Sequence, residues 1–197
     1  MAKTVANVTR DSKDHPAPKN RESSHWIKVY AWRSDGTLYG HASLQTSSKS
    51  KHNYMSHWPE GESEGNSKIG SSVNDTSEFK RALLDDEKAE GRKADFVVKI
   101  KVSEQQLRNI EKYIEQRKET HATWTGLDNC TDAVVKTLKA GGIVNYKLKF
   151  NRGIFDIAST PLELIEKIKL DAKTRSDFEI LRDENPHLNK DPQQIRK

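Results

Sequence analysis

Three short segments rich in β-branched and aromatic residues follow one another early in the chain, and they constrain its fold most. They cover Trp26–Trp32, Leu38–Gln45 and Asn53–Trp58, and polar turn residues separate them. Segments of this length and composition, joined by short turns, are typical of neighbouring strands in an antiparallel sheet. Pro59 cannot donate a hydrogen bond to a strand ladder, so it ends the third segment. The sequence therefore predicts an antiparallel meander.

Strand and helix patterns alternate in the rest of the chain. Phe96–Val102 alternates apolar and polar residues, which predicts a half-buried strand. Ser103 and Gln106 have the spacing of a capping box, and they open a helix that extends to Glu119. Residues 143–150 alternate again and predict another strand, and Thr160-Pro161 starts a further helix. Together these patterns predict an α+β fold with an antiparallel sheet packed against helices.

Composition limits the class of protein. Hydrophobic residues make up only 33% of the chain and the mean hydropathy is −0.91, so part of it is expected to be solvated. Residues 1–24 are polar and are interpreted as a flexible tail. No apolar run approaches the roughly 18 residues of a membrane span, and no apolar stretch of a Sec-type signal is visible at the N-terminus. A single cysteine fits a reducing compartment. The expected location is cytoplasmic, or outside the cell after export by a specialised secretion system.

Charge is unevenly distributed along the chain. The net charge is +5, but residues 53–95 hold ten Asp or Glu against six Lys or Arg. No nucleic-acid motif accompanies the basic residues, so nucleic acid is not an expected partner, although a basic surface that binds nucleic acid or lipid stays an alternative. Residues 59–94 form an acidic insertion with a helical pattern from Thr76 to Glu90. It could serve as a lid, select basic substrates, or be a solvated loop without a role.

The only cysteine, Cys130, stands at the predicted start of a helix. Val134, Val135 and Leu138 form an apolar stripe after it, and Asp128 or Asn129 can cap the helix N-terminus. The unpaired N–H groups and the dipole at this end favour a thiolate and could bind an oxyanion. The alternative is that Cys130 is a small buried apolar residue.

Two histidines lie on the predicted strands upstream. If the second and third strands form a hairpin in which residue 41 lies opposite residue 57, the rings of His41 and His57 share one face. One imidazole could then take the cysteine proton while the other fixes its tautomer. If the rings point to opposite faces, Asn53 or Ser56 would be the candidate for the orienting role. The two histidines could also be unrelated. Scattered His and one Cys lack metal-ligand spacing, so no metal or other cofactor is expected.

Three short motifs now form a recognisable set. They are Tyr39-Gly40-His41, then Tyr54-x-x-His57-x-Pro59, then Asn129-Cys130. In this order they resemble the circularly permuted branch of the papain-like amidohydrolase superfamily, which includes lecithin–retinol acyltransferase and the small phospholipase/acyltransferases. The resemblance covers roughly Trp26 to Phe150. It implies that Cys130 is the nucleophile, His41 the base and His57 the orienting residue.

The resemblance also implies a domain organisation and a function. Residues 25–158 would form a permuted papain-like catalytic domain that contains the 59–94 insertion, and residues 159–197 would add a C-terminal helical extension. The expected function is a cysteine hydrolase of peptidase or amidase type that acts on a peptide, amide or acyl-ester substrate through a thioester. Bacterial members of the superfamily include toxins and effectors. An acyltransferase or phospholipase of the same superfamily and an inactive binding module are the alternatives. The oligomeric state is left open.

Overall fold

The computed structural model describes residues 25–34, 40–48, 53–60, 68–69, 72–74, 79–119, 128–146 and 160–184. The predicted tail over residues 1–24 lies outside these ranges. Residues 35–37 of the turn between the first two predicted strands and the chain after residue 184 also lie outside them.

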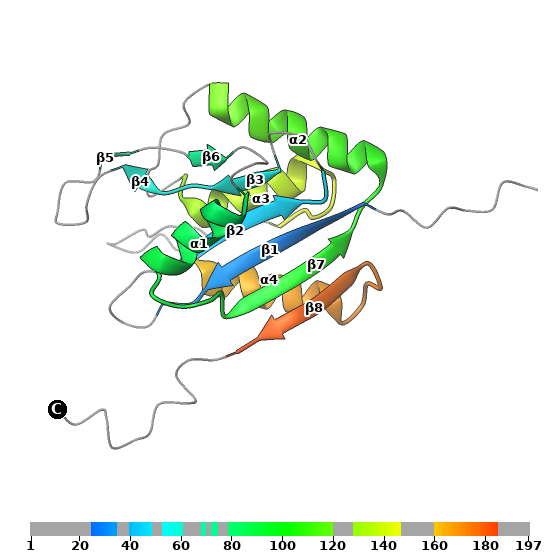
Figure 1. The fold of residues 1–197 in the computed structure, drawn as a ribbon. Helices are drawn as coiled ribbons and strands as arrows, with labels where there is room; N and C mark the ends of the chain where they lie inside the picture. The colour runs from blue at the N-terminus through cyan, green and yellow to red at the C-terminus, as the bar shows by residue number, and fades with distance from the viewer. Residues whose placement is uncertain are drawn as a thin grey trace, which may run out of the picture.

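The central element is a six-stranded antiparallel sheet with the strand order β6-β3-β2-β1-β7-β8 (Figure 1). Its strands are β1 (Trp26–Trp32), β2 (His41–Thr46), β3 (Tyr54–Ser56), β6 (Ser72–Asn74), β7 (Phe96–Lys101) and β8 (Phe178–Asp183). The short strands β4 (Pro59–Glu60) and β5 (Lys68–Ile69) pair separately. The predicted meander is confirmed, because β1 pairs with β2 and β2 with β3, each time antiparallel.

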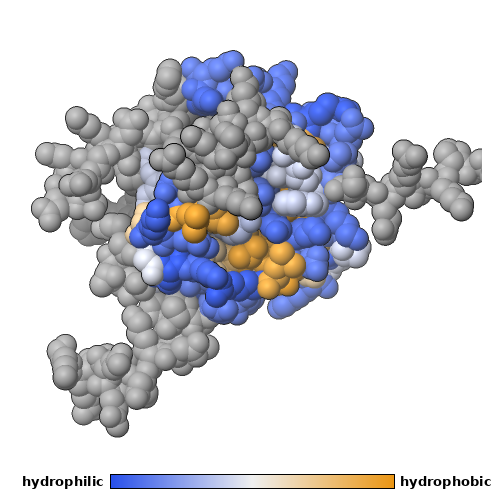
Figure 2. Space-filling model, viewed as in Figure 1, coloured by the Kyte–Doolittle hydropathy of each residue, from blue (hydrophilic) through white to orange (hydrophobic). Residues whose placement is uncertain are grey.

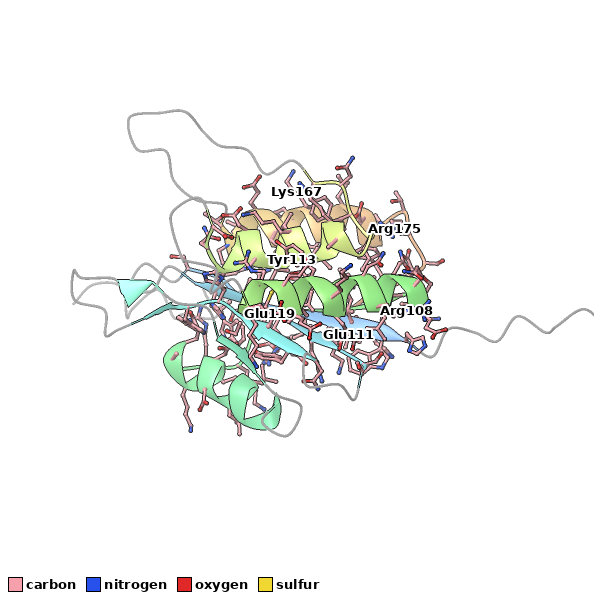
Figure 3. All side chains as sticks on the ribbon, turned by 90° about the horizontal axis from the view of Figure 1, so that it is seen from above. Arg108, Glu111, Tyr113, Glu119, Lys167 and Arg175 are labelled. Carbon is pink, nitrogen blue, oxygen red and sulfur yellow. The ribbon has the colours of Figure 1, made fainter. Side chains whose placement is uncertain are left out.

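Four helices in the described residues pack around this sheet. They are α1 (Phe79–Ala89), α2 (Glu104–Glu119), α3 (Cys130–Ala140) and α4 (Pro161–Ala172). Seen from above, α1 lies on one side of the sheet and α3 and α4 lie on the other (Figure 3). The predicted α+β class with an antiparallel sheet is therefore confirmed.

Strand alternation divides the buried side chains between these two faces. On β1, Val29 and Ala31 belong to the main core with residues of α2, α3 and α4, whereas Tyr30 and Trp32 belong to a smaller cluster that contacts Leu83 of α1. Burying one large apolar side chain contributes about 1.5–3 kcal/mol. The larger cluster is therefore the main source of stability.

Two expectations about the end of the chain need correction. Residues 143–146 form no strand, because Ile143 donates its N–H to Leu138 and its carbonyl accepts from Arg175, so neither group is free for a strand ladder. Residues 147–150 lie outside the described ranges. The expected C-terminal helical extension contains α4 but also β8, which pairs with β7 and completes the same sheet.

The surface is mainly hydrophilic on the face drawn in Figure 2, with small apolar patches. Large apolar side chains that are exposed in the described residues are Leu84, Leu162, Leu170, Ile180 and Leu181. Within the described ranges, none of the helices combines the length and apolarity that a bilayer crossing requires.

Candidate functional site

The first turn of α3 holds Cys130 in a defined position. Asn129 is the N-cap: its side chain accepts a hydrogen bond from the backbone N–H of Asp132 at 3.0 Å. The Asp132 carboxylate accepts in return from the Asn129 N–H at 3.4 Å, which completes a capping box. Cys130 is the first helical residue and is 8% exposed. Its side chain therefore lies at the positive end of the helix dipole.

Gly40 brings β2 close to the end of β1 just before His41. Its φ is +79°, and a Cβ atom added there would lie 2.4 Å from the carbonyl oxygen of Trp32. The two backbone segments approach closely at this glycine, and no other residue type could replace it without displacing the backbone. His41 is consequently fixed at the first position of β2.

The His41 ring is enclosed by aromatic side chains. It stacks on Trp58 with a centroid distance of 3.9 Å and an interplanar angle of 20°, and Trp32 lies 5.5 Å away on a tilted plane. His41 is 1% exposed. In such a desolvated position, each polar contact of the ring has a large effect on its protonation.

One ring nitrogen of His41 faces a serine and a carboxylate. Nε2 lies 2.8 Å from Ser56 Oγ and 3.5 Å from Asp86 Oδ2. Ser56 donates its own hydrogen to Asp86 Oδ1 at 2.8 Å, so its oxygen must accept from His41 and Nε2 must carry a proton. The Cys130 side chain lies close enough to the ring to raise the pKa of His41. Because Nε2 is engaged, Nδ1 is the nitrogen available to the sulfur.

Asp86 projects from α1 and is 3% exposed. Besides Ser56, it accepts hydrogen bonds from the Tyr54 hydroxyl and from Trp58 Nε1 at 2.8 Å. Residues 54, 56 and 58 alternate along one chain segment, so their side chains share a face. Burial alone would raise the pKa of Asp86, but the hydrogen bond and the charge of His41, with the donors Tyr54 and Trp58, outweigh it and lower the pKa. Asp86 is therefore a carboxylate at neutral pH.

This carboxylate controls the charge of His41. Burial alone would lower the pKa of His41, but its interactions with the Asp86 carboxylate and with the nearby Cys130 raise it to about 10. The imidazole is therefore an imidazolium at neutral pH. Asp86 and Cys130 both lie close to this ring.

His57 does not occupy the predicted position beside His41. The strands pair with Ser43 opposite Ser56 and Leu44 opposite Met55, and continuing this register places His41 opposite Trp58. The predicted register was wrong by one residue, and a shift of one residue moves a side chain to the other face of the sheet. The orienting contact expected of His57 is made by Ser56 and Asp86 instead.

His57 instead contacts α2. Its Nδ1 lies 2.7 Å from Nη2 of Arg117, and Nη1 of Arg117 binds the Asp128 carboxylate at 3.2 Å. Asp128 also binds Lys136 at 3.1 Å. Burial, followed by the positive charge of Arg117, lowers the pKa of His57 to about 4. His57 is therefore a neutral imidazole at physiological pH.

Of the two alternative orienting residues, Ser56 contacts the His41 ring, whereas Asn53 is not seen to do so. Asn53 is buried, and its Oδ1 atom has no hydrogen-bond partner among the described residues. The sequence-based reasoning missed Asp86 altogether, because it lies in the acidic insertion. A signal was available: Asp86 and Glu90 continue the helical spacing of Phe79 and Leu83, which places carboxylates on the apolar side of that helix. Both are buried, so this part of the insertion is not a solvated loop, which was one of the alternatives left open.

The described residues contain no group of three or more His, Cys, Asp or Glu side chains arranged to hold a metal ion. In comparisons with protein-family models, with curated proteins and with solved structures, no match to this chain was found. The chemistry available to the site therefore has to be judged from its own geometry. That geometry joins a thiol at a helix N-terminus to a buried imidazolium and a buried carboxylate.

Proposed function

We propose that this protein is a cysteine hydrolase that cleaves an amide or ester carbonyl compound through a thioester. The observation that carries the proposal is the position of the buried His41 ring, which lies near Cys130 and is hydrogen-bonded to Ser56, which in turn donates to Asp86. A nucleophile, a base in contact with it and a group that orients the base are the three parts that thiol-based acyl transfer requires.

In the first half of the reaction, the Cys130 thiolate attacks the carbonyl carbon and the carbonyl oxygen becomes an oxyanion. The imidazolium of His41 then gives its Nδ1 proton to the leaving nitrogen or oxygen as the bond to carbon breaks. The acyl group remains on Sγ as a thioester. Backbone N–H groups at the start of α3 have no intrahelical acceptor and can donate to the oxyanion.

In the second half, neutral His41 accepts a proton from water at Nδ1 while the water oxygen attacks the thioester carbonyl. Collapse of that intermediate releases the acid and restores the thiolate and imidazolium. Asp86, through Ser56 and directly at 3.5 Å, keeps Nε2 protonated throughout, which reserves Nδ1 for the chemistry. An acyl acceptor other than water would turn the same cycle into acyl transfer.

The experiment is intact mass spectrometry of the protein with a panel of acyl and peptide probes. The wild type should acquire one acyl group, and Cys130→Ala should acquire none. His41→Ala should remove labelling to a similar extent, and the double variant should be little worse than either because the two residues act as a unit. His25→Ala, which changes a histidine at the start of β1 away from the site, is the matched control.

A second measurement separates an enzyme from an inactive binding module. Alkylation of Cys130 by iodoacetamide at mildly acidic pH should be fast in the wild type and slow in His41→Ala, because only a thiolate reacts there. Equal and slow alkylation in both proteins would contradict the proposed hydrolase and favour the binding module.

A further inference from the structure

His57 presents a buried hydrogen-bond donor that the proposed cycle has not used. A guanidinium can only donate, so the contact at 2.7 Å with Arg117 requires Nδ1 of His57 to be an acceptor without a proton. Arg117 is held in turn by Asp128. A neutral imidazole with an unprotonated Nδ1 carries its hydrogen on Nε2. The tautomer of His57 is thus fixed by α2.

The Nε2–H group of His57 has no partner in the part of the chain that the structure describes. His57 is only 2% exposed, so this donor lies away from bulk solvent. Leaving a buried donor unpaired costs free energy, and native structures rarely keep one without a role. An acceptor supplied by a ligand would remove this cost.

The position of His57 relative to α3 indicates which ligand atom could reach it. Thr137 of α3 donates to Met55 Sδ at 3.3 Å, which fixes β3 against the helix. Cys130 lies two turns before Thr137, about 10 Å along the same helix face. His57 lies two residues after Met55, about 6.5 Å along the strand and on the same side of it.

The contacts of Arg117 indicate toward which end of α3 His57 lies from Met55. It joins His57 to Asp128, which lies two residues before Cys130 at the N-terminal end of α3. His57 therefore lies at the Cys130 end of the helix, on the sheet face that α3 covers. His41 reaches the same end of the sheet from the opposite face, where Asp86 binds it.

We propose that Nε2–H of His57 donates a hydrogen bond to the carbonyl oxygen of the acyl group that Cys130 attacks, and so completes the oxyanion hole with the backbone N–H of Cys130. This inference rests on the proposed hydrolase. It assigns His57 a role in binding the oxyanion, and it explains why α2 holds the ring in one neutral tautomer: a fixed donor costs no reorganisation when charge develops on the oxygen.

The test compares two reactions of Cys130 that differ only in whether an oxyanion forms. p-Nitrophenyl acetate acylates the thiol through a tetrahedral oxyanion, whereas iodoacetamide alkylates it by displacement at a CH₂ group. His57→Leu should lower the acylation rate by about 10²- to 10³-fold and leave the alkylation rate within a few-fold of wild type. His57→Gln should recover much of the loss, because its oxygen can accept from Arg117 while its nitrogen donates.

His25→Gln is the control, and circular dichroism checks the fold of each variant. If His57→Leu does not fold, His57→Met, which also lacks an N–H, takes its place. Equal losses in acylation and alkylation, or no loss in either, would overturn the oxyanion role. If the wild type itself alkylates no faster than a free thiol, the proposed hydrolase fails instead, so the two failures are distinguishable.

Discussion

Two histidines on adjacent chain segments, both almost fully buried, have opposite electrostatic environments. The pKa of His41 is raised to about 10 and that of His57 is lowered to about 4. Burial lowers both values, so the difference comes from the partners. His41 meets the carboxylate of Asp86, whereas His57 meets the guanidinium of Arg117.

Strand geometry explains how one sheet keeps two such environments apart. Tyr54, Ser56 and Trp58 point to the face where α1 supplies Asp86. Met55 and His57 point to the face covered by α2 and α3. The difference teaches that the burial of a histidine says little about its charge, and that the helix packed on its strand face decides whether the pKa of the ring is raised or lowered.

Replacing the carboxylate on the His41 side should have the largest effect. Asp86→Asn removes the charge that raises the pKa of His41 and frees the ring to adopt the wrong tautomer. Turnover, or acylation of Cys130 by the best probe, should fall by about 10²- to 10⁴-fold. Asp85→Asn is the matched control, because the neighbouring Asp85 is 59% exposed on the same helix and pairs only with the exposed Lys88 among the described residues. An unchanged rate in Asp86→Asn would remove Asp86 from the site.

The pH dependence of stability should separate the two histidines by sign. The stability from His41, whose pKa is raised, is complete below pH 6.5 and is lost as the pH rises toward 10. The stability from His57, whose pKa is lowered, is complete above pH 6.5 and is lost as the pH falls toward 4.

Urea unfolding between pH 4 and 9.5 measures this difference. Each histidine contributes a slope of at most about 1.4 kcal/mol per pH unit. Relative to the wild type, His41→Gln should flatten the loss on the alkaline side, and His57→Gln should flatten the loss on the acidic side. The same flattening on one side in both variants would mean that the two environments are not opposite.

Removing the cation on the His57 side should have an intermediate effect. Arg117→Met takes away a hydrogen bond to His57 and one to Asp128, so the free energy of unfolding should fall by about 1–3 kcal/mol. The pKa of His57 should rise, which NMR titration of the ring can follow. Arg108→Met is the control, because Arg108 lies on the outer side of α2 (Figure 3) and is mostly exposed. A His57 pKa that stays near 4 would show that burial alone sets it.

The smallest effect is expected at the aromatic neighbour of His41. Trp58→Phe keeps a ring to stack on His41 but removes the indole N–H that binds Asp86 at 2.8 Å. Stability should fall by about 0.5–1.5 kcal/mol, with the pKa of Asp86 slightly raised and that of His41 little changed. A large fall in the pKa of His41 would instead make the Trp58–Asp86 bond a main support of the imidazolium.

Local sequence patterns determined much of this protein. Short segments rich in β-branched and aromatic residues predicted β1, β2 and β3, and alternating apolar residues predicted β7. Helical spacing with caps predicted the segments that form α2 and α4. Each of these signals depends on a few neighbouring residues. Gly40 stands directly before His41, at a position where the close approach of the β1 backbone tolerates only glycine. The candidates Cys130 and His41 followed from similarly local cues.

Only the tertiary structure decided the partners of those candidates. The register of β2 and β3 differs by one residue from the symmetric hairpin that the sequence suggested. Because of this shift, Ser56 contacts the His41 ring in place of His57. Asp86 lies on α1, 45 positions after His41 in the sequence. β8, which pairs with β7, follows it much later in the chain. Such contacts are set by which faces pack together, and residue spacing carries no information about them because the connecting segments can have any length.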